Sequence, residues 1–494
     1  MQVIILSDVQ PNCGRNAGAY RVASELRKNG YSVLVIEWFQ SLGKEFVFSL
    51  LEKHVTDETL WVGFSTTFTS SADTNHDFMA KLKETDGWFS TFVIGQDIKS
   101  YFDHIKKLNS KTQIVIGGAK SFHYKILEDS RLGIPADWYF HKSADHSVVP
   151  FTDWLAGKSS APIIVGGNEI HGLGVYDVKD FSKITIDWHD LDWVQPDEYI
   201  PIELARGCIF KCKFCDYDLT GKRRGEYTKT LDTMVAELTR NYEKYQTTNY
   251  LISDETLNDS MEKAQLIYDI SQQLPFKWTF GGYARLDLYW ANIAEMPHMM
   301  QEAGLKGHFF GVETFSERAG KAVGKGLGGD KIKKTLIDLN KIWGDNVLVE
   351  LGIIAGLPYE PFSEFMETIK WIIEPSTPVD LASCFALQIF KTQSSIFGSD
   401  PEKYGFRFED NSRFNWSWGD DLTFQKANNM ARIGALLLER KNKPGWWLYA
   451  ELANLNEFTE HELRNTKLVD IDPQRVTNAK DRKLLKYKNF LLSL

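Results

Sequence analysis

The apolar positions of the first 150 residues form short runs, and amphipathic stretches separate them. Four of these runs predict buried strands, at 3–9, 31–38, 60–67 and 113–119. Between the first two runs, residues 18–30 have the apolar spacing of a helix that ends at Gly30. Strand runs that alternate with helical patterns are typical of a parallel sheet covered by helices. The pattern therefore predicts an α/β domain over residues 1–150, with a Rossmann-like, doubly wound sheet.

A second alternation of strands and helices extends over residues 198–390. Six apolar runs predict strands, at 199–206, 249–255, 276–285, 306–314, 347–358 and 380–390. The amphipathic stretches between them predict helices, at 230–245, 260–273, 289–303, 330–343 and 362–373. This order again predicts parallel strands, but six βα units are fewer than the eight of a closed barrel.

Two further regions lack this alternation. Residues 151–197 predict a linker, because Gly, Ser and Pro gather at its start. In 391–494 we expect a mostly helical C-terminal region, where aromatic segments at 413–424 and 444–452 could line a substrate cavity, cap the barrel or pack in a core. Its last fifteen residues are basic and amphipathic, which fits either a membrane or partner contact or a docked terminal helix.

Composition and charge narrow the class of protein. Of the 494 residues, 43% are hydrophobic and 25% charged, which is typical of a globular protein. No apolar run reaches the length of a membrane span, and the first residues have no basic segment of a secretory signal, so we expect a cytoplasmic protein. The net charge of -9 argues against general nucleic-acid binding. Five cysteines are too few for a disulfide scaffold.

Three of the five cysteines lie within eight residues. Cys208, Cys212 and Cys215 have the spacing C-x3-C-x2-C, whereas Cys13 and Cys384 are isolated. Three thiolates from one loop can hold three corners of a [4Fe–4S] cluster and leave one iron open to a small molecule. A structural zinc site is the alternative, but it normally needs four protein ligands. The two isolated cysteines are expected to be small buried hydrophobic residues.

Polar residues follow several predicted strands of the second region. Asp254 and Glu255 follow the second strand, Arg285 the third, and Glu313 the fourth, and a glycine-containing segment ends the fifth. Catalytic side chains of α/β barrels gather at these strand ends. Each residue also has a structural interpretation. The two carboxylates at 254 and 255 could cap a helix, and Arg285 could form a surface ion pair. Glu313 could instead pair with Arg318 or Lys321.

The loop RGCIFKCKFC resembles the cluster-binding loop of the radical S-adenosylmethionine (SAM) superfamily. The segments ISDET, GVETFSE and GIIAGLPYE are similar to the strand-end motifs of that family. The resemblance covers about residues 198–390 and implies a partial (β/α)6 barrel. It also implies a [4Fe–4S] cluster on the three grouped cysteines and bound SAM. The residues expected near SAM are Phe214, Asp254, Glu255, Arg285, Glu313, Ile354 and Gly356.

An α/β domain ahead of such a barrel resembles the radical SAM enzymes with an N-terminal cobalamin-binding domain. In the loop after the first strand, Gln10 stands where the cobalamin motif D-x-H-x-x-G has histidine. The resemblance implies that cobalamin would bind near Asp8, Gln10, Ser65, Thr66, Gly117 and Gly118. A domain that binds no cofactor, or that only helps dimerisation, is the alternative.

The resemblance implies an enzyme that cleaves SAM reductively and carries out radical chemistry on an unknown small molecule or peptide. With cobalamin, the expected outcome is methyl transfer; without it, hydrogen abstraction leading to epimerisation, rearrangement or cyclisation. A metal-stabilised binding protein without enzymatic activity is the alternative from another class. Five basic residues lie in and after the cysteine loop: Lys211, Lys213, Lys222, Arg223 and Arg224. They could bind an acidic flavodoxin or ferredoxin as electron donor, bind a phosphate-bearing substrate, or belong to a solvated loop.

Overall fold

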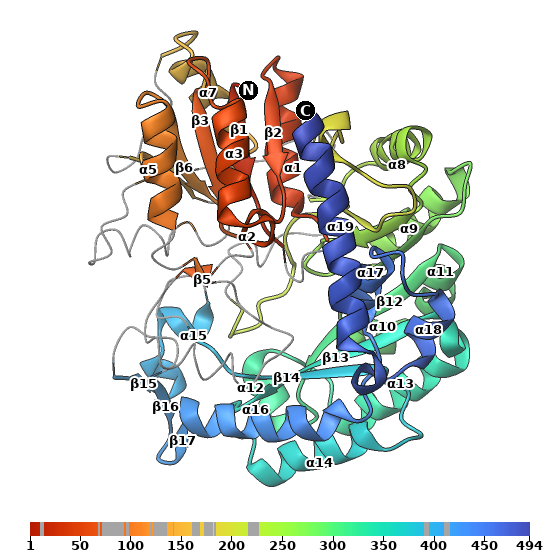
Figure 1. The fold of residues 1–494 in the computed structure, drawn as a ribbon. Coiled ribbons are helices and arrows are strands. Elements are labelled where there is room, and N and C mark those ends of the chain that lie inside the picture. Colours follow the sequence, from red (N-terminus) through yellow and green to blue (C-terminus); the bar gives the residue numbers. More distant parts are fainter. Residues whose placement is uncertain are drawn as a thin grey trace. The chain divides into compact units, whose positions relative to one another are not determined.

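The computed structural model of the chain divides into two compact units (Figure 1). The first unit contains Met1–Pro201, Arg240–Thr247 and Thr477–Leu494, and the second contains Ile202–Thr239 and Thr248–Val476. The structure describes residues 1–9, 14–67, 70–71, 93–94, 98–118, 121, 136–141, 143–160, 168–171, 181, 184–215, 227–389, 395–409 and 415–494.

The first unit is built on a six-stranded sheet in the order β2-β1-β3-β6-β7-β8, and every recorded strand pair is parallel. Its strands are β1 Val3–Leu6, β2 Val33–Ile36, β3 Trp61–Ser65, β6 Gln113–Gly117, β7 Trp138–His141 and β8 Glu169–His171. All residues of β1 and β2 are buried, as expected for strands with helices on both faces. The predicted Rossmann-like α/β fold is therefore confirmed.

Helices of the first unit include α1 Ala17–Lys28, α2 Phe39–Leu42, α3 Lys44–His54, α5 Ile98–Leu108 and α7 Val148–Leu155. Helix α1 begins at its N-cap Asn16, whose side chain accepts a hydrogen bond from the Gly18 backbone amide. Strand β8 lies in the range that the sequence predicts as a linker. At three residues it is too short to produce a recognisable apolar pattern.

The C-terminal helix α19, Pro473–Ser493, ends in the first unit. Tyr487 and Leu491 are fully buried in the core that contains the residues of β1, β2 and β3. The Tyr487 ring packs edge-on against Trp38 at 5.1 Å, and its hydroxyl accepts a hydrogen bond from the Glu37 backbone amide. Of the two alternatives for this basic amphipathic segment, the structure contains the docked terminal helix.

The second unit contains six strands in sequential order, β14-β13-β12-β11-β10-β9. They are β9 Ile200–Ile202, β10 Asn249–Ile252, β11 Thr279–Ala284, β12 Leu305–Glu313, β13 Leu348–Ala355 and β14 Leu381–Ala386. Every recorded pair among β10 to β14 is parallel. Each predicted strand of this region is present, and the partial (β/α)6 barrel is confirmed.

Helices follow the strands as α8 Leu231–Tyr245, α9 Met261–Gln273, α10 Leu286–Ala291, α11 Met296–Glu302, α12 Glu317–Val323, α13 Gly329–Trp343 and α14 Phe362–Ile373. The predicted helix at 289–303 is wrong, because the structure has α10 and α11 in its place. Pro297 lacks an amide hydrogen and sits in the first turn of α11, where a helix tolerates proline.

The C-terminal region closes one end of the barrel interior. Side chains at Gly281 of β11 and Gly307 of β12 would collide with the ring of Trp446, which begins helix α17 Trp446–Ala453. The carboxylate of Glu350, on β13, lies against Gly445. These contacts make the start of α17 the floor of the barrel.

Other C-terminal elements pack around the same unit. Helix α16, Phe424–Glu439, packs against β14 and α14. Short elements complete the description: α15 Ile396–Ser399, β15 Phe406–Phe408, β16 Trp416–Trp418, β17 Leu422–Thr423, α18 Glu460–Asn465 and the pair β4 Ser70–Ser71 and β5 Val93–Ile94. Within the described part of the chain, no helix is long and apolar enough to cross a membrane.

Glu350, on the floor of the barrel, should make the stability of the folded chain depend on pH. Burial raises the pKa of Glu350 from 4.5 to about 8, so the folded chain keeps this proton while the unfolded chain releases it. The free energy of unfolding should therefore fall by about 2 kcal/mol as the pH rises from about 6 to about 8. In urea unfolding of the full chain, Glu350→Gln should flatten this slope. The exposed Glu367→Gln is the control and should leave the slope unchanged; an equal slope in both variants would contradict the assignment.

Candidate functional site

The cysteine loop follows β9 directly and is held by backbone hydrogen bonds. Cys208, Cys212 and Cys215 are partly buried, and none of the three is in a disulfide bond in the part of the chain that the structure describes. The amide of Lys213 donates to the Val323 carbonyl at 3.0 Å, and the Lys213 carbonyl accepts from the Phe397 amide at 2.9 Å. These hydrogen bonds hold the backbone of the loop in place, and its three thiols are neither fully buried nor fully exposed to solvent.

Asp254 and Glu255 connect the end of β10 to the start of this loop. One oxygen of Asp254 accepts hydrogen bonds from the amides of Leu204 and Ala205, both at 2.9 Å. Glu255 accepts from the amide of Gly207 at 2.7 Å. Because Gly207 has a φ of 99°, glycine is favoured where the chain turns into the loop. Neither carboxylate is the N-cap of α9, which is Ser260, so the helix-capping interpretation is wrong.

Arg285 lies at the end of β11 and contacts the loop twice. Its Nη1 is 3.3 Å from the Sγ of Cys212, and its guanidinium lies 3.9 Å from the centre of the Phe210 ring. Two further nitrogens form a bidentate ion pair with Asp287, at 3.0 and 2.6 Å. Arg285 is only 6% exposed, so it is not the surface ion pair that the sequence left open. It holds a fixed positive charge beside one thiol, which favours a thiolate or an anionic group there.

Glu313 ends β12 in an uncommon backbone conformation. Its φ is 68°, in the left-handed region, and the pairing register of β12 with β13 shifts at this point. The carboxylate pairs with the Lys325 ammonium at 3.2 Å, and Lys325 also donates to the Gly311 carbonyl at 2.7 Å. Arg318 and Lys321, the partners considered from the sequence, interact with Tyr359 and Glu317 instead.

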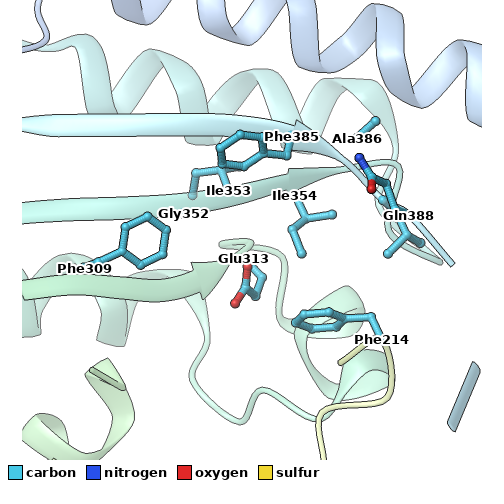
Figure 2. Close-up of a pocket in the computed structure, with 10 residues that line it drawn as sticks. Phe214, Phe309, Glu313, Gly352, Ile353, Ile354, Phe385, Ala386 and Gln388 are labelled. Atoms are coloured by element: carbon cyan, nitrogen blue, oxygen red, sulfur yellow. The ribbon is translucent and has the colours of Figure 1, made fainter. Parts of the chain in front are cut away.

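A cavity of about 320 Å³ joins the cysteine loop to the strand ends (Figure 2). Phe214 of the loop, Glu313 of β12 and Ile354 of β13 border it together. The other lining residues are Phe309, Gly352, Ile353, Phe385, Ala386, Leu387 and Gln388. Its size is within the range of small-molecule sites in proteins. Three of the residues predicted near SAM therefore share one cavity.

Gly356 follows β13 with a φ of 83°, which favours glycine. The place of its missing Cβ is taken by the Cβ of Ala427 on helix α16. The close approach at Gly356 is thus between a strand end and a helix.

The structure describes one of the two isolated cysteines. Cys384 lies on β14, and its Sγ packs near Gly434 of α16. Cys13 lies outside the described residues. In the ranges that the structure covers, no three His, Cys, Asp or Glu side chains are placed to hold a single metal ion. The cysteine loop offers three thiols, which is the number of protein ligands of a cluster with an open iron, whereas a structural zinc site has four.

In the first unit, the ends of β1, β3 and β6 bring the other predicted residues to one edge of the sheet. Asp8 follows β1 and is fully buried, and burial together with Glu37 raises its pKa to about 8. Ser65 accepts a hydrogen bond from the side chain of Asn16 at 2.8 Å. The Thr66 amide donates to the Gly117 carbonyl at 2.8 Å.

Two features of this edge concern a ligand. A Cβ at Gly118, whose φ is 99°, would lie 2.8 Å from the Thr66 nitrogen. The Oδ1 of Asp8 has no hydrogen-bond partner among the residues that the structure describes. Buried polar atoms normally have a hydrogen-bond partner, so this oxygen could bind a polar group of a ligand. Gln10 lies outside the described residues.

Residues 202–372 match the model of the Radical SAM superfamily. The chain carries a radical SAM domain. The match begins in β9 and ends in α14, so it includes the cysteine loop and the ends of β10 to β13. The family resemblance of the motifs is thereby confirmed.

Part of the chain is similar to a curated protein. Over 206 residues the chain is 30% identical to the uncharacterized methyltransferase PH0819 of Pyrococcus horikoshii. The match covers 39% of this chain and 42% of that protein. This chain thus spans less than half the length of the curated relative that it matches.

Two solved structures are similar to the whole chain. One is the cobalamin-dependent S-adenosylmethionine radical enzyme OxsB with aqua-cobalamin bound, with a TM-score of 0.62, 14% identity and coverage of 100% of this chain and 72% of that one. The other is the radical S-adenosylmethionine methyltransferase TsrM from Kitasatospora setae with cobalamin and a [4Fe–4S] cluster bound. Its TM-score is 0.61 at 12% identity, and the likeness covers 99% of each chain. At these identities the likeness shows a shared fold.

Four residues of the radical SAM domain that were not predicted contact the predicted site residues. Lys263, on α9, pairs with Asp254 at 2.7 Å, and Lys325 pairs with Glu313. Asn258 exchanges two hydrogen bonds with the backbone of Arg285, both at 2.9 Å. Thr256 lies 3.3 Å from Cys208, Oγ1 to Sγ. Only Thr256 had a signal, because it stands within the ISDET segment; the other three lie outside the motifs.

Proposed function

We propose that this chain is a radical SAM enzyme in which Cys208, Cys212 and Cys215 hold a [4Fe–4S] cluster. The observation that carries the proposal is a single loop with three partly buried thiols, beside Arg285 and bordering the cavity of Glu313 and Ile354. When bound, the cluster supplies the electron that cleaves SAM into methionine and a 5′-deoxyadenosyl radical.

The residues of the chain divide into two roles in this proposal. Phe214, Glu313 and Ile354 contact SAM, since they border the cavity next to the loop. Three other residues predicted near SAM position the loop. Asp254 and Glu255 accept hydrogen bonds from the backbone leading into it, and Arg285 contacts the Phe210 ring and the Cys212 thiol. The predicted contact of Gly356 with SAM is through its backbone, because Ala427 fills its side-chain direction.

Methyl transfer that depends on cobalamin is the proposed reaction. The edge of the first unit would hold the cofactor, with Asp8, Gln10, Ser65, Thr66, Gly117 and Gly118 as the contact residues. The Asp8 Oδ1, which has no hydrogen-bond partner among the described residues, supports this. The names of the similar proteins, which include methyltransferases and cobalamin-dependent enzymes, support it as well. An Asp8 with a pKa near 8 is mostly protonated at neutral pH and can donate a hydrogen bond to a carbonyl oxygen.

The electron donor in this proposal is an acidic flavodoxin or ferredoxin. Lys211 is exposed on the cysteine loop, and the Lys213 ammonium lies 5.2 Å from the centre of the Tyr404 ring. Lys222, Arg223 and Arg224 lie outside the described residues. Positive charge beside the cluster loop would steer an acidic partner to the place where the electron is needed.

Anaerobic reconstitution tests the function. The full chain should turn brown, bind about four irons and, with dithionite, release 5′-deoxyadenosine from SAM. A colourless protein that holds zinc and leaves SAM intact would overturn the proposal in favour of a metal-stabilised binding protein.

A second measurement tests the proposed reaction. The chain should retain hydroxocobalamin through gel filtration, and Asp8→Ala should retain less of it. If the wild-type chain retains none yet releases 5′-deoxyadenosine, hydrogen abstraction replaces methyl transfer as the reaction.

A further inference from the structure

We infer that the substrate of this radical SAM site presents a neutral aromatic ring to the barrel interior. The inference rests on the proposed function and names the substrate class of the same cavity. It starts from three aromatic side chains on the strands of the barrel, Tyr283 of β11, Phe309 of β12 and Phe385 of β14, of which Phe309 and Phe385 line the cavity. Tyr283 and Phe385 are 40% and 43% exposed, which is unusual for large rings inside a barrel.

Strand pairing explains why the rings of Tyr283 and Phe309 share a face. Tyr283 pairs with Phe309, and Gly281 pairs with Gly307. Side chains two residues apart lie on the same side of a strand, and both glycines face Trp446 on the barrel floor. The rings of Tyr283 and Phe309 therefore stand one layer above the floor. Phe309 borders the cavity, as does Phe385 from β14 (Figure 2).

The ring of Phe309 is held in place by its neighbours. It packs edge-on against Tyr283, with centroids 5.2 Å apart, and Tyr283 packs against Trp447 at 5.1 Å. A Cβ at Gly352 would lie 2.7 Å from the Cζ of Phe309, so only glycine leaves room for the ring on this strand. A fixed aromatic surface binds another ring with little loss of side-chain entropy.

The charge of the lining excludes an ionic headgroup against this wall. Glu313 is the charged residue among the described lining residues, and it pairs with Lys325. Arg285, which contacts the cysteine loop, pairs with Asp287 and lies beside Cys212. The amide of Gln388 adds a neutral polar group to the lining. Against the lining residues that the structure describes, an anionic substrate group would therefore lose its hydration without gaining a cation, whereas a neutral ring loses little.

Probe binding tests this inference. The cluster-loaded full chain with SAM would be dialysed anaerobically against indole, against cyclohexanol as a saturated ring, and against phenyl phosphate as an anionic one. Indole should bind at least several-fold more tightly than either comparison probe. Phe309→Leu and Phe385→Leu should each weaken indole binding by roughly three- to tenfold, because they remove ring–ring contacts.

Phe362→Leu is the matched control, since Phe362 is 48% exposed at the start of α14 and outside the cavity. It should leave indole binding unchanged, and iron content checks the folding of every variant. Equal binding of cyclohexanol, tighter binding of phenyl phosphate, or unchanged indole binding in both cavity variants would overturn the inference. Release of 5′-deoxyadenosine by the wild-type chain tests the proposed function separately. A chain that releases it but shows no preference for indole refutes only the substrate class.

Discussion

Replacing Cys208, Cys212 or Cys215 with alanine should each abolish the bound cluster and reduce 5′-deoxyadenosine release to background. The reason is the small number of donors. The loop offers three thiols, and the one other described cysteine, Cys384, is on β14 against α16. A cluster that loses one of three protein ligands has no neighbouring thiol to replace it. Iron content, visible absorbance and SAM cleavage of the anaerobically reconstituted chain measure the effect.

Cys384→Ala is the matched control for these variants. It removes one thiol from the same unit of the chain but no proposed ligand, so cluster and activity should stay at the wild-type level. Full iron content in any of the three loop variants would refute the ligand assignment. Cluster loss in Cys384→Ala would show that the assignment omits a ligand.

Asp254→Ala should destabilise the chain by about 3–5 kcal/mol, because it leaves the Lys263 ammonium buried without its main partner. Both side chains are almost fully buried and lie 2.7 Å apart. Burial opposes the charge of Lys263, whereas Asp254 and the more distant Asp259 raise its pKa, so removing Asp254 takes away the carboxylate that stabilises the ammonium most. The substitution also removes the acceptor for the amides of Leu204 and Ala205. Urea unfolding of the full chain measures the loss.

Two variants separate the buried pair from a general effect of lost charge. Asp254→Ala combined with Lys263→Met removes both charges and should be more stable than Asp254→Ala alone. Glu317→Ala breaks the exposed pair with Lys321 and should change stability little. If the double variant is no more stable than Asp254→Ala, the unpaired ammonium is not the cause.

The strands and the order of the two α/β regions could be predicted because parallel strands are apolar on both faces and leave continuous runs. The six runs from 198 to 390 became β9 to β14, and the runs at 3–9 and 31–38 became β1 and β2. The break between α10 and α11 was missed, although Pro297 marks it. Strand β8 has no such signal, since three residues cannot show a period.

The spacing of Cys208, Cys212 and Cys215 and the polar strand ends identified the candidate site from local sequence alone, because these residues lie in short contiguous motifs. What each strand-end residue touches depended on the tertiary structure. Asp254 reaches the amides before the cysteine loop, Arg285 reaches Cys212 across 73 positions of sequence, and Glu313 finds Lys325.

The aromatic residues at the cavity likewise could not be grouped from the sequence. The pairing of β11 with β12 brings the rings of Tyr283 and Phe309 together, and Phe385, from β14, borders the same cavity as Phe309. An apolar run indicates which residues form a strand, because each buried position of the strand favours an apolar side chain. Which side chains meet across strands is decided by pairing and packing, and these long-range contacts leave no period in the sequence.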